Sequence, residues 1–151
     1  MSERIAIADA NVLVALVLED HVDHGAARRW LTQVARFATT PMTEVALVRL
    51  LLNPAITVDA DGRPLAIGAA IDTLQAIKAL PNAEFVADST SIADARAVTR
   101  HITGHRQVTD THLLNLAIAH GGVLATFDAK IHGSLKPRDR KHVHLIGQNE
   151  Q

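Results

Sequence analysis

The stretch IAIADANVLVAL, residues 5–16, decides the fold because it places two polar side chains between two apolar runs. Residues 5–8 are apolar without helical spacing, which is typical of a strand buried on both faces of a sheet. Residues 11–18 then predict the start of a helix. Asp9 and Asn11 stand at the junction, where a buried carboxylate costs free energy unless it is paired or hydrogen-bonded. These two residues therefore either satisfy local backbone groups or take part in chemistry.

Short apolar runs alternate with helical patterns along the rest of the chain. Thr40 and Thr109 are expected helix caps, and Pro41 suits a first helical position. Further strands are expected at 36–39, 84–87, 123–128 and 143–146, and further helices at 26–34, 41–52, 64–80, 91–101 and 110–120. This alternation indicates an α/β domain with a mainly parallel sheet and helices on both faces.

The composition bounds the class of protein. At 151 residues the chain fits one compact domain, so we expect a single domain over residues 1–151. Apolar residues make up 48% and aromatic residues 3%, which predicts a globular protein with an aliphatic core. The 15 basic and 16 acidic side chains give a formal net charge of -1, so a nucleic-acid site must come from local clustering of charge.

The sequence also indicates where the protein works. It contains no cysteine, which excludes disulfides, thiolate zinc sites and cysteine nucleophiles and fits a reducing cytoplasm. No secretory signal is visible, and the apolar run at residues 12–18 is far shorter than the ~20 residues that a membrane helix needs. We therefore expect a soluble, cytoplasmic protein with no membrane partner.

Four acidic residues occupy equivalent places in this pattern. Asp9 follows the first strand and Asp128 follows the fourth, while Glu44 and Asp110 lie in the first turns of two helices. Ligands of open α/β sheets bind beyond the carboxyl ends of the strands, so all four acids can project to one edge. Singly, Glu44 or Asp110 could complement a helix dipole, worth ~0.3–1 kcal/mol. Asp128 could likewise cap the turn that follows it.

Carboxylates that converge on one edge repel one another, and a bound cation would hold them ionised together. Oxygen ligands in a chain without cysteine favour Mg²⁺ or Mn²⁺ over zinc. Such ions activate water and neutralise the charge that develops on a phosphoryl group. The four acids therefore suggest a metal-dependent phosphodiesterase.

Four stretches of the chain, taken in order, resemble the successive motifs of a known family. They are IADANVLVAL at 7–16, TEVALVRLLLNP at 43–54, VTDTHLLNLAIAHGG at 108–122 and LATFD at 124–128. They are similar to the motifs of PIN-domain ribonucleases, specifically the VapC toxins of bacterial toxin–antitoxin pairs, and the second resembles the branch abundant in mycobacteria. The resemblance extends from Ile5 to about Ile146 and implies a three-layer α/β/α domain with a parallel sheet.

The resemblance implies an acidic active site and gives its residues roles. The catalytic and metal-binding acids would be Asp9, Glu44, Asp110 and Asp128. In the expected mechanism Asp9 and Asp110 hold a Mg²⁺ or Mn²⁺ ion. Glu44 and Asp128 complete its shell or support a second ion. Asn11 is expected to orient Asp9 or to hold a water, and Thr126 matches a small hydroxyl position near the last acid. Activated water then cleaves a phosphodiester bond of RNA, and translation is inhibited.

The resemblance also implies two protein partners. A small cognate VapB-type antitoxin would wrap around the toxin and block its acidic cleft, and the toxin would form a homodimer. From the residues themselves, the run LAIGAAIDTLQAIKAL at 65–80 is apolar enough to supply an interaction face as well as core.

Basic residues gather in two places that could hold the RNA backbone. The group near the C-terminus consists of Lys136, Arg138, Arg140 and Lys141. The group that precedes Asp110 consists of Arg96, Arg100, His101, His105 and Arg106. The alternative for each group is a solvated charged face. Because aromatic residues are scarce, we expect recognition by shape and backbone rather than by stacked bases.

Three residues are left open between a structural and a functional role. Asp88 follows the third strand and could join the acidic edge or act as a cap. His112 could touch the site or be structural, and Arg49 could steady a carboxylate or bind a partner or phosphate.

Other functions remain as alternatives to the nuclease. An aspartyl-nucleophile phosphatase would need a second Asp where this chain has Asn11, and the glycine-rich motifs of nucleotide-binding folds are absent. A non-catalytic RNA-binding or protein-interaction module with the same fold is the main alternative. RNA binding without metal-dependent cleavage would distinguish it.

Overall fold

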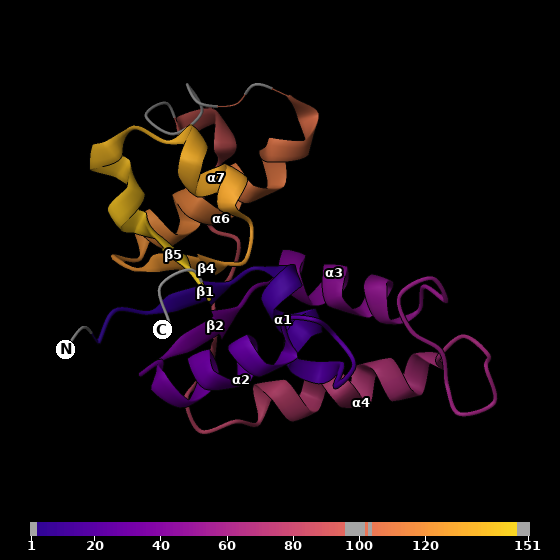
Figure 1. Ribbon diagram of the computed structural model, residues 1–151. Coiled ribbons are helices and arrows are strands. Elements are labelled where there is room, and N and C mark those ends of the chain that lie inside the picture. The colour runs from indigo at the N-terminus through magenta and orange to yellow at the C-terminus, as the bar shows by residue number, and fades with distance from the viewer. Residues whose placement is uncertain (1–2, 96–101, 103, 148–151) are drawn as a thin grey trace.

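The computed structural model describes residues 3–95, 102 and 104–147 (Figure 1). Its strands are β1 (Ala6–Ala8), β2 (Phe37–Thr39), β3 (Ala83–Phe85), β4 (Val123–Thr126) and β5 (Val143–Leu145). Its α-helices are α1 (Ala10–Val17), α2 (His24–Gln33), α3 (Pro41–Leu51), α4 (Ile67–Lys78), α6 (Val108–Ala119) and α7 (Ala129–Ser134). Its short 3₁₀ helices are η1 (Ile92–Asp94), η2 (His105–Gln107) and η3 (Pro137–His142).

The strands form one sheet in the order β3-β2-β1-β4-β5, and every neighbouring pair is parallel. β1 is central, because Ala6 pairs with Phe37 of β2 on one side and Ala8 pairs with Ala125 of β4 on the other. The carboxyl ends of all strands therefore meet at one edge, and Asp9 follows the strand in its middle. The prediction of a mainly parallel sheet is confirmed.

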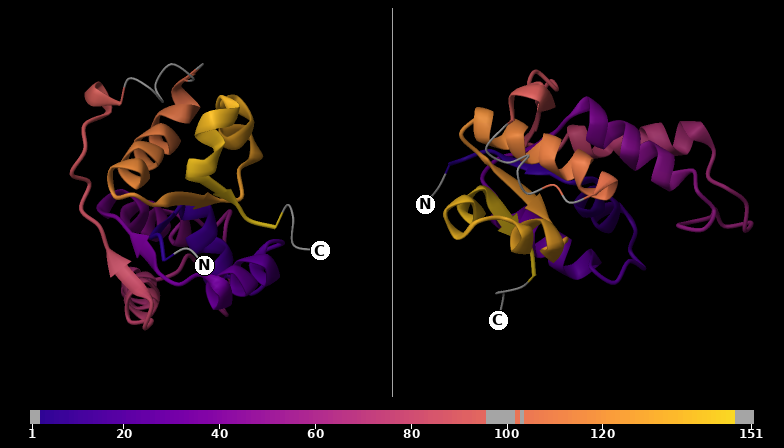
Figure 2. Two further views of the ribbon diagram at one scale, coloured as in Figure 1. Left: turned by 90° about the vertical axis from the view of Figure 1, so that its left-hand side faces the viewer. Right: turned by 90° about the horizontal axis from the view of Figure 1, so that it is seen from above.

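Helices cover both faces of the sheet, as Figures 1 and 2 show. The alternation of side chains along the first strand decides which residue faces which layer. Ala6 and Ala8 belong to a core cluster with residues of α1, α2, α3 and α4, whereas Ile5 and Ile7 belong to a second cluster with residues of α6 and α7. The expected three-layer α/β/α architecture is confirmed.

The first turn of α3 is fixed by its own sequence. Thr40 and Thr43 form a capping box: the Thr40 hydroxyl accepts from the Thr43 amide at 3.2 Å, and the Thr43 hydroxyl accepts from the Thr40 amide at 2.9 Å. Pro41 occupies the first helical position as predicted. This cap places Glu44 in the first turn, and α3 and α4 then run side by side as an arm that projects beyond the sheet (Figure 1).

The prediction that Thr109 caps α6 is wrong. The helix begins at Val108, because the 3₁₀ turn η2 leads directly into it and Gln107 takes the N-cap position. Thr111 contributes to this start, since its hydroxyl donates to the Gln107 carbonyl at 2.8 Å. Asp110 still lies in the first turn, so the position expected for this acid is confirmed.

The helix expected at 91–101 is described only at its beginning. There the chain forms η1, with the Ser91 hydroxyl accepting from the Ala93 amide at 3.1 Å. Arg96, Arg100 and His101 lie outside the described residues. The boundaries of the other expected elements differ by a few residues, as helix and strand ends usually do. The helix α7 and the 3₁₀ helices η2 and η3 were not expected from the sequence.

The turn between α6 and β4 depends on a close approach to the first strand. Gly121 has a φ of 67°, the left-handed conformation that commonly ends a helix. A Cβ on Gly122 would lie 2.2 Å from the Ile5 carbonyl oxygen, and the next amide, that of Val123, donates to the same oxygen at 2.9 Å. Glycine at 122 therefore allows β4 to start directly beside β1. Among the described residues, no helix combines the length and apolar character needed to cross a membrane.

Candidate functional site

Asp9 begins the site at the carboxyl end of β1. Its side chain is only 8% exposed, and its amide donates to the Ala125 carbonyl at 2.9 Å, which ties the residue to β4. Although Asp9 occupies the N-cap position of α1, its side chain makes no capping hydrogen bond. The amides of Ala10 and Asn11 lie near enough to favour the charged form, but burial is the larger effect and raises the pKa of Asp9. The neighbouring backbone amides therefore leave the Asp9 carboxyl available for other contacts.

A buried hydroxyl holds the Asp9 carboxyl in place. Thr126, at the end of β4, donates from Oγ1 to Oδ2 of Asp9 at 2.9 Å. Oγ1 of Thr126 in turn accepts from Nδ2 of Asn11 at 3.2 Å and from the Asp128 amide at 3.1 Å. Asn11 is itself held, because its Oδ1 accepts from the Phe127 amide at 3.3 Å. With one bond donated and two accepted, the Thr126 hydroxyl is fully satisfied, and Asn11 acts on Asp9 through it.

Asp110 and Asp128 join Asp9 at this edge. The pKa of Asp110 is raised to about 7, first by burial, then by the negative charges of Asp9 and Asp128 and by a hydrogen bond with Asp9. The charge of Asp128 likewise contributes to the raised pKa of Asp9. The structure therefore brings together three of the four acids that the sequence suggested.

Asp128 also has a structural role. It is the N-cap of α7, and its Oδ1 accepts from the Lys130 amide at 2.9 Å. The capping alternative considered for this residue is thus confirmed, and it coexists with a position beside the other acids. One oxygen of the carboxyl is committed to the helix start, which fixes the direction of the side chain.

Glu44 lines a different cavity from the one that Asp110 and Asp128 line. Its Oε2 accepts from the Thr39 hydroxyl at 2.6 Å and forms an ion pair with Nζ of Lys78 at 2.7 Å. Lys78 comes from the last turn of α4, and its ammonium also lies 4.3 Å from the centre of the Phe85 ring. The sequence carried no signal for this ion pair, because the partners are 34 residues apart and meet only through the packing of α3 against α4.

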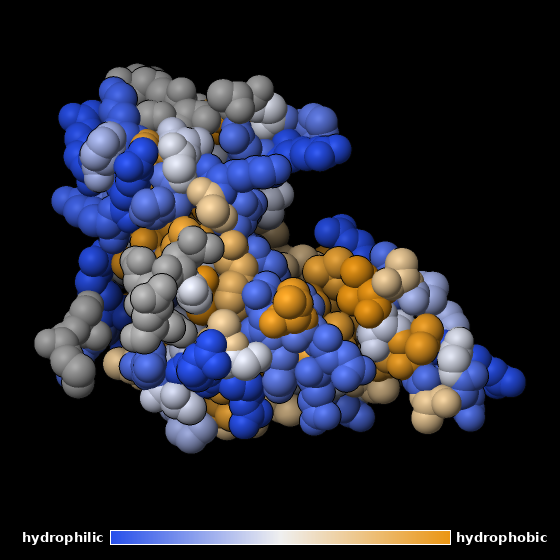
Figure 3. Space-filling view, viewed as in Figure 1, coloured by the Kyte–Doolittle hydropathy of each residue, from blue (hydrophilic) through white to orange (hydrophobic). Residues whose placement is uncertain are grey.

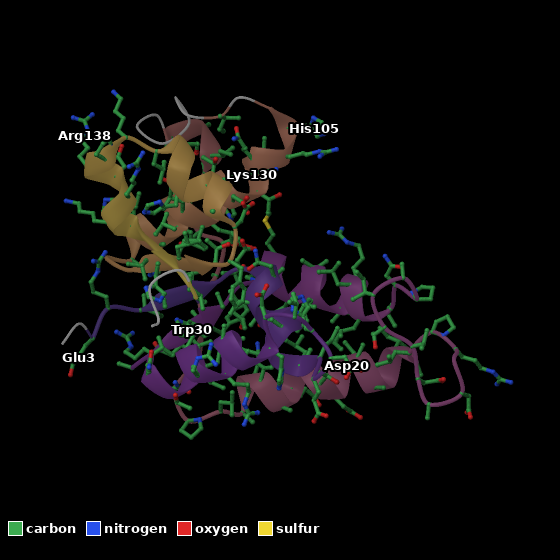
Figure 4. All side chains as sticks on the ribbon, in the orientation of Figure 1. Glu3, Asp20, Trp30, His105, Lys130 and Arg138 are labelled. Carbon is green, nitrogen blue, oxygen red and sulfur yellow. The ribbon has the colours of Figure 1, made fainter. Side chains whose placement is uncertain are left out.

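The acidic cluster opens into a cavity of about 360 Å³. Asp110 and Asp128 line it together with His105, Arg106 and Lys130, so positive side chains border the acids. Figure 3 shows that the surface is hollowed between the layer of α6 and α7 and the arm of α3 and α4. Figure 4 shows His105 and Lys130 on the layer of α6 and α7. Lys130 was not singled out from the sequence, although its place two residues after Asp128 in a helical first turn was a usable signal.

The C-terminal basic group lies elsewhere. Arg138 is on the far side of the same layer from His105 (Figure 4), and Lys141 lines a separate cavity with Arg4 and Trp30. Nε of Arg140 donates to a backbone carbonyl, that of Leu135, at 3.2 Å. The structure thus places Arg106, but not these residues, on the cavity that the acids line.

The acidic cluster is not a completed ligand set. Across residues 3–95, 102 and 104–147, no three His, Asp or Glu side chains are already arranged to hold one metal ion. Two of the acids already have protein partners: Oε2 of Glu44 pairs with Lys78, and Oδ1 of Asp128 accepts from the Lys130 amide. Asp9 and Asp110 are the pair whose carboxyls share a hydrogen bond.

This fold and site match known proteins. Residues 6–133 match the family model described as PIN domain, and the chain belongs to the PIN-domain family. It is 38% identical to Ribonuclease VapC38 of Mycobacterium tuberculosis, over 94% of this chain and 98% of that protein. It is also 41% identical to Ribonuclease VapC29 of the same organism, over 85% of this chain and 92% of that protein. Within the family, it groups with the VapC ribonucleases.

Solved structures agree with this placement of the fold. VapC20 of Mycobacterium tuberculosis, a Sarcin-Ricin loop cleaving toxin, matches with a TM-score of 0.60 at 14% identity, over 85% of this chain and 94% of that chain. VapBC2 of Rickettsia felis, bound to a DNA fragment from the promoter, matches with a TM-score of 0.59 at 13% identity, over 94% of this chain and 98% of that chain. At these identities the likeness establishes the shared architecture.

Proposed function

We propose that this chain is a divalent-metal-dependent endoribonuclease that serves as the toxin of a toxin–antitoxin pair. The observation that carries the proposal is the cluster of Asp9, Asp110 and Asp128, in which burial first and the charges of the other two carboxyls second raise the pKa of Asp110 to about 7. Such mutual repulsion in a cavity is characteristic of a site that works with a cation or a proton. The substrate class rests on the relatives, which are named as ribonucleases.

The acids fit Mg²⁺ or Mn²⁺ by the chemistry of their donors. Asp9, Asp110 and Asp128 would hold the ion through hard oxygen ligands. Glu44 would contribute after exchanging its ion pair with Lys78. A bound ion would activate water and neutralise the charge that develops on the phosphoryl group during cleavage.

The chain's own residues prepare this site. Thr126 and Asn11 hold the Asp9 carboxyl in one orientation. Burial and the negative charges of Asp9 and Asp128 raise the pKa of Asp110 to about 7, so the carboxyl is partly protonated at neutral pH, and a bound cation would favour loss of that proton. Arg106 and Lys130 border the cavity and would hold the RNA backbone on either side of the scissile phosphate.

A protein partner would bind the arm of α3 and α4. An apolar groove of about 680 Å³ lies along it and is lined by Val45, Val48, Ile71 and Phe85 among others. Within the run expected to serve both core and surface, Leu74 is buried while Ile71 is 37% exposed. Apolar side chains of this region are visible in Figure 3. We propose that a small VapB-type antitoxin uses this surface and that the toxin itself is a homodimer; light scattering at high concentration that gave only monomer would contradict the dimer.

The decisive experiment for the enzymatic function compares wild type with Asp9→Asn on an RNA substrate. Wild type should cleave with Mg²⁺ or Mn²⁺ and stop when a chelator is added, whereas Asp9→Asn should fold, as checked by circular dichroism, and not cleave. Asp61→Asn, in an exposed loop, is the matched control and should cleave as wild type does. Full activity of Asp9→Asn would refute the proposal.

The second candidate is an RNA-binding module without catalysis. The ion pair of Glu44 with Lys78 favours it, because that contact already engages one of the four acids with a lysine. RNA binding by wild type that persists without any Mn²⁺-dependent cleavage would establish this alternative. Mapping RNA ends after expression of wild type and Asp9→Asn in cells would identify the target.

A further inference from the structure

Asp88 links the helices that carry two of the proposed catalytic acids. Its Oδ2 accepts from the Met42 amide at 3.1 Å, and its Oδ1 accepts from Nε2 of His112 at 3.0 Å. Met42 precedes Glu44 by two residues on α3, and His112 follows Asp110 by two residues on α6. One carboxylate therefore connects the first turn of α3 with the N-terminal part of α6.

The contact with α3 completes the start of that helix. The first amides of a helix have no partner within it, and here Pro41 has no N–H. The capping box satisfies the Thr43 amide, and the Glu44 amide donates to the Thr40 carbonyl at 2.9 Å. The Met42 amide is the remaining donor of this turn, and Asp88 accepts from it. A carboxylate at a helix N-terminus is also favoured by the helix dipole.

The contact with α6 acts where that helix lacks a cap of its own. The N-cap residue of α6 makes no side-chain capping hydrogen bond, and the Thr111 hydroxyl bonds the Gln107 carbonyl at this start, so the contact with Asp88 adds a tie from outside the helix to the segment that carries Asp110. The His112 side chain is 12% exposed and that of Asp88 22%, so their hydrogen bond is largely shielded from water. Asp88 is not needed by its own segment, because Ser91 caps η1.

We propose that Asp88, through His112, is a positioning residue for the cleavage reaction: it holds the N-terminal parts of α3 and α6 at a fixed separation. Glu44 and Asp110, which would both hold the ion, then keep the relative placement that this carboxylate sets. The inference rests on the proposed nuclease function. Neither Asp88 nor His112 would contact substrate. The proposal explains why Met42 and His112, which each lie two residues from a proposed catalytic acid, are joined through Asp88.

The experiment compares Asp88→Ala and His112→Ala with wild type in Mn²⁺-dependent cleavage of a short RNA, with kcat and KM measured separately. Partners of metal ligands change activity or metal affinity by roughly 10–100-fold, and we expect a loss of this size in kcat with KM changed less than about 2-fold. Because His112 acts through Asp88, the double variant should lose no more than Asp88→Ala alone. His112→Gln, which keeps an N–H donor, should recover most of the loss.

Two further measurements separate positioning from folding. Mn²⁺ affinity, followed by electron paramagnetic resonance, should weaken in Asp88→Ala by roughly 10-fold or more, whereas a purely structural tie would lower only the unfolding temperature. Glu84→Ala is the matched control, because it removes an exposed ion pair with Arg36 that also joins separate segments. It should leave kcat and Mn²⁺ affinity unchanged.

The outcomes are distinguishable. Wild-type kcat and Mn²⁺ affinity in Asp88→Ala and in His112→Ala would overturn this inference and leave the nuclease intact. A wild-type protein that neither binds Mn²⁺ nor cleaves RNA would overturn the proposed function, and the inference with it. If Asp88→Ala does not fold, Asp88→Asn, which keeps one oxygen acceptor, decides the question by the same two measurements.

Discussion

The hydroxyl of Thr126 donates a 2.9 Å hydrogen bond to the carboxyl of Asp9, and both groups are buried at the end of adjacent central strands. Thr126→Val keeps the shape of the side chain but removes this donor and leaves the Asp128 amide and the Asn11 amide group without their acceptor. A buried polar group without a partner costs about 1–3 kcal/mol. We therefore expect a lower free energy of unfolding in urea and reduced cleavage.

Thr126→Ser is the control for this prediction. It keeps the hydroxyl and removes only a methyl group, so it should retain most of the activity while losing some packing. Equal activity of the Val and Ser variants would show that the hydroxyl does not orient Asp9 for the reaction.

The raised pKa of Asp110 predicts how the stability of the metal-free protein depends on pH. In the unfolded chain this group titrates near 3.8 and in the folded protein near 7, so the folded state binds the proton more tightly. The resulting stabilisation is complete below about pH 3.8 and is lost as pH rises through 7. In chelator, the unfolding temperature should therefore fall between pH 5 and pH 8 by about 5 °C or more, since ~1 kcal/mol corresponds to about 2–4 °C at this size.

Asp110→Asn isolates this contribution. The variant should unfold at a higher temperature than wild type at pH 8 and show a flatter pH profile, while its metal-dependent cleavage is lost. The comparison is needed because burial lowers the pKa of His142, which works in the opposite direction and destabilises the folded state as pH falls. Added Mn²⁺ should raise the unfolding temperature of wild type but not of Asp110→Asn. An identical pH profile in the two proteins would contradict the assignment.

The sequence contained enough information to predict the sheet, its parallel strands and the positions of the acids along the chain. Asp9 follows a short apolar run, and Glu44 follows a capping threonine and a proline; these are local features with local causes. What could not be predicted is where Glu44 points, because Lys78 reaches it from a helix 34 residues later. The role of Asp88 was equally hidden, since both of its partners belong to other segments of the chain.

Lys130 should contribute to RNA binding through its charge. It lines the cavity beside Asp110 and Asp128, where a backbone phosphate would approach the acids. Lys130→Ala should raise KM several-fold at moderate salt and reduce the slope of log affinity against log salt by about 1, as expected when one phosphate contact is lost. Lys141→Ala is the comparison, because that residue lines a different cavity with Trp30. If the slope of log affinity against log salt changed only in Lys141→Ala, RNA would bind along the C-terminal segment instead.

The close approach of Gly122 to Ile5 predicts a strong effect of a single methyl group. A Cβ at 122 would lie 2.2 Å from the Ile5 carbonyl oxygen and 2.7 Å from its side chain, and neither backbone can move without disturbing the pairing of β1 with β4. Overpacking of this kind costs about 1–3 kcal/mol or more, so Gly122→Ala should lower the free energy of unfolding by at least that amount.

The same variant should also reduce cleavage, because β4 carries Thr126 into contact with Asp9 and any shift of the strand lengthens their hydrogen bond. Gly68→Ala is the matched control: no atom lies within 4 Å of a Cβ there, and within α4 alanine favours the helix over glycine by up to ~1 kcal/mol. That variant should be as stable as wild type or more stable, with unchanged activity. If urea unfolding gave the two alanine variants the same stability, the contact between β1 and the start of β4 would not constrain the site.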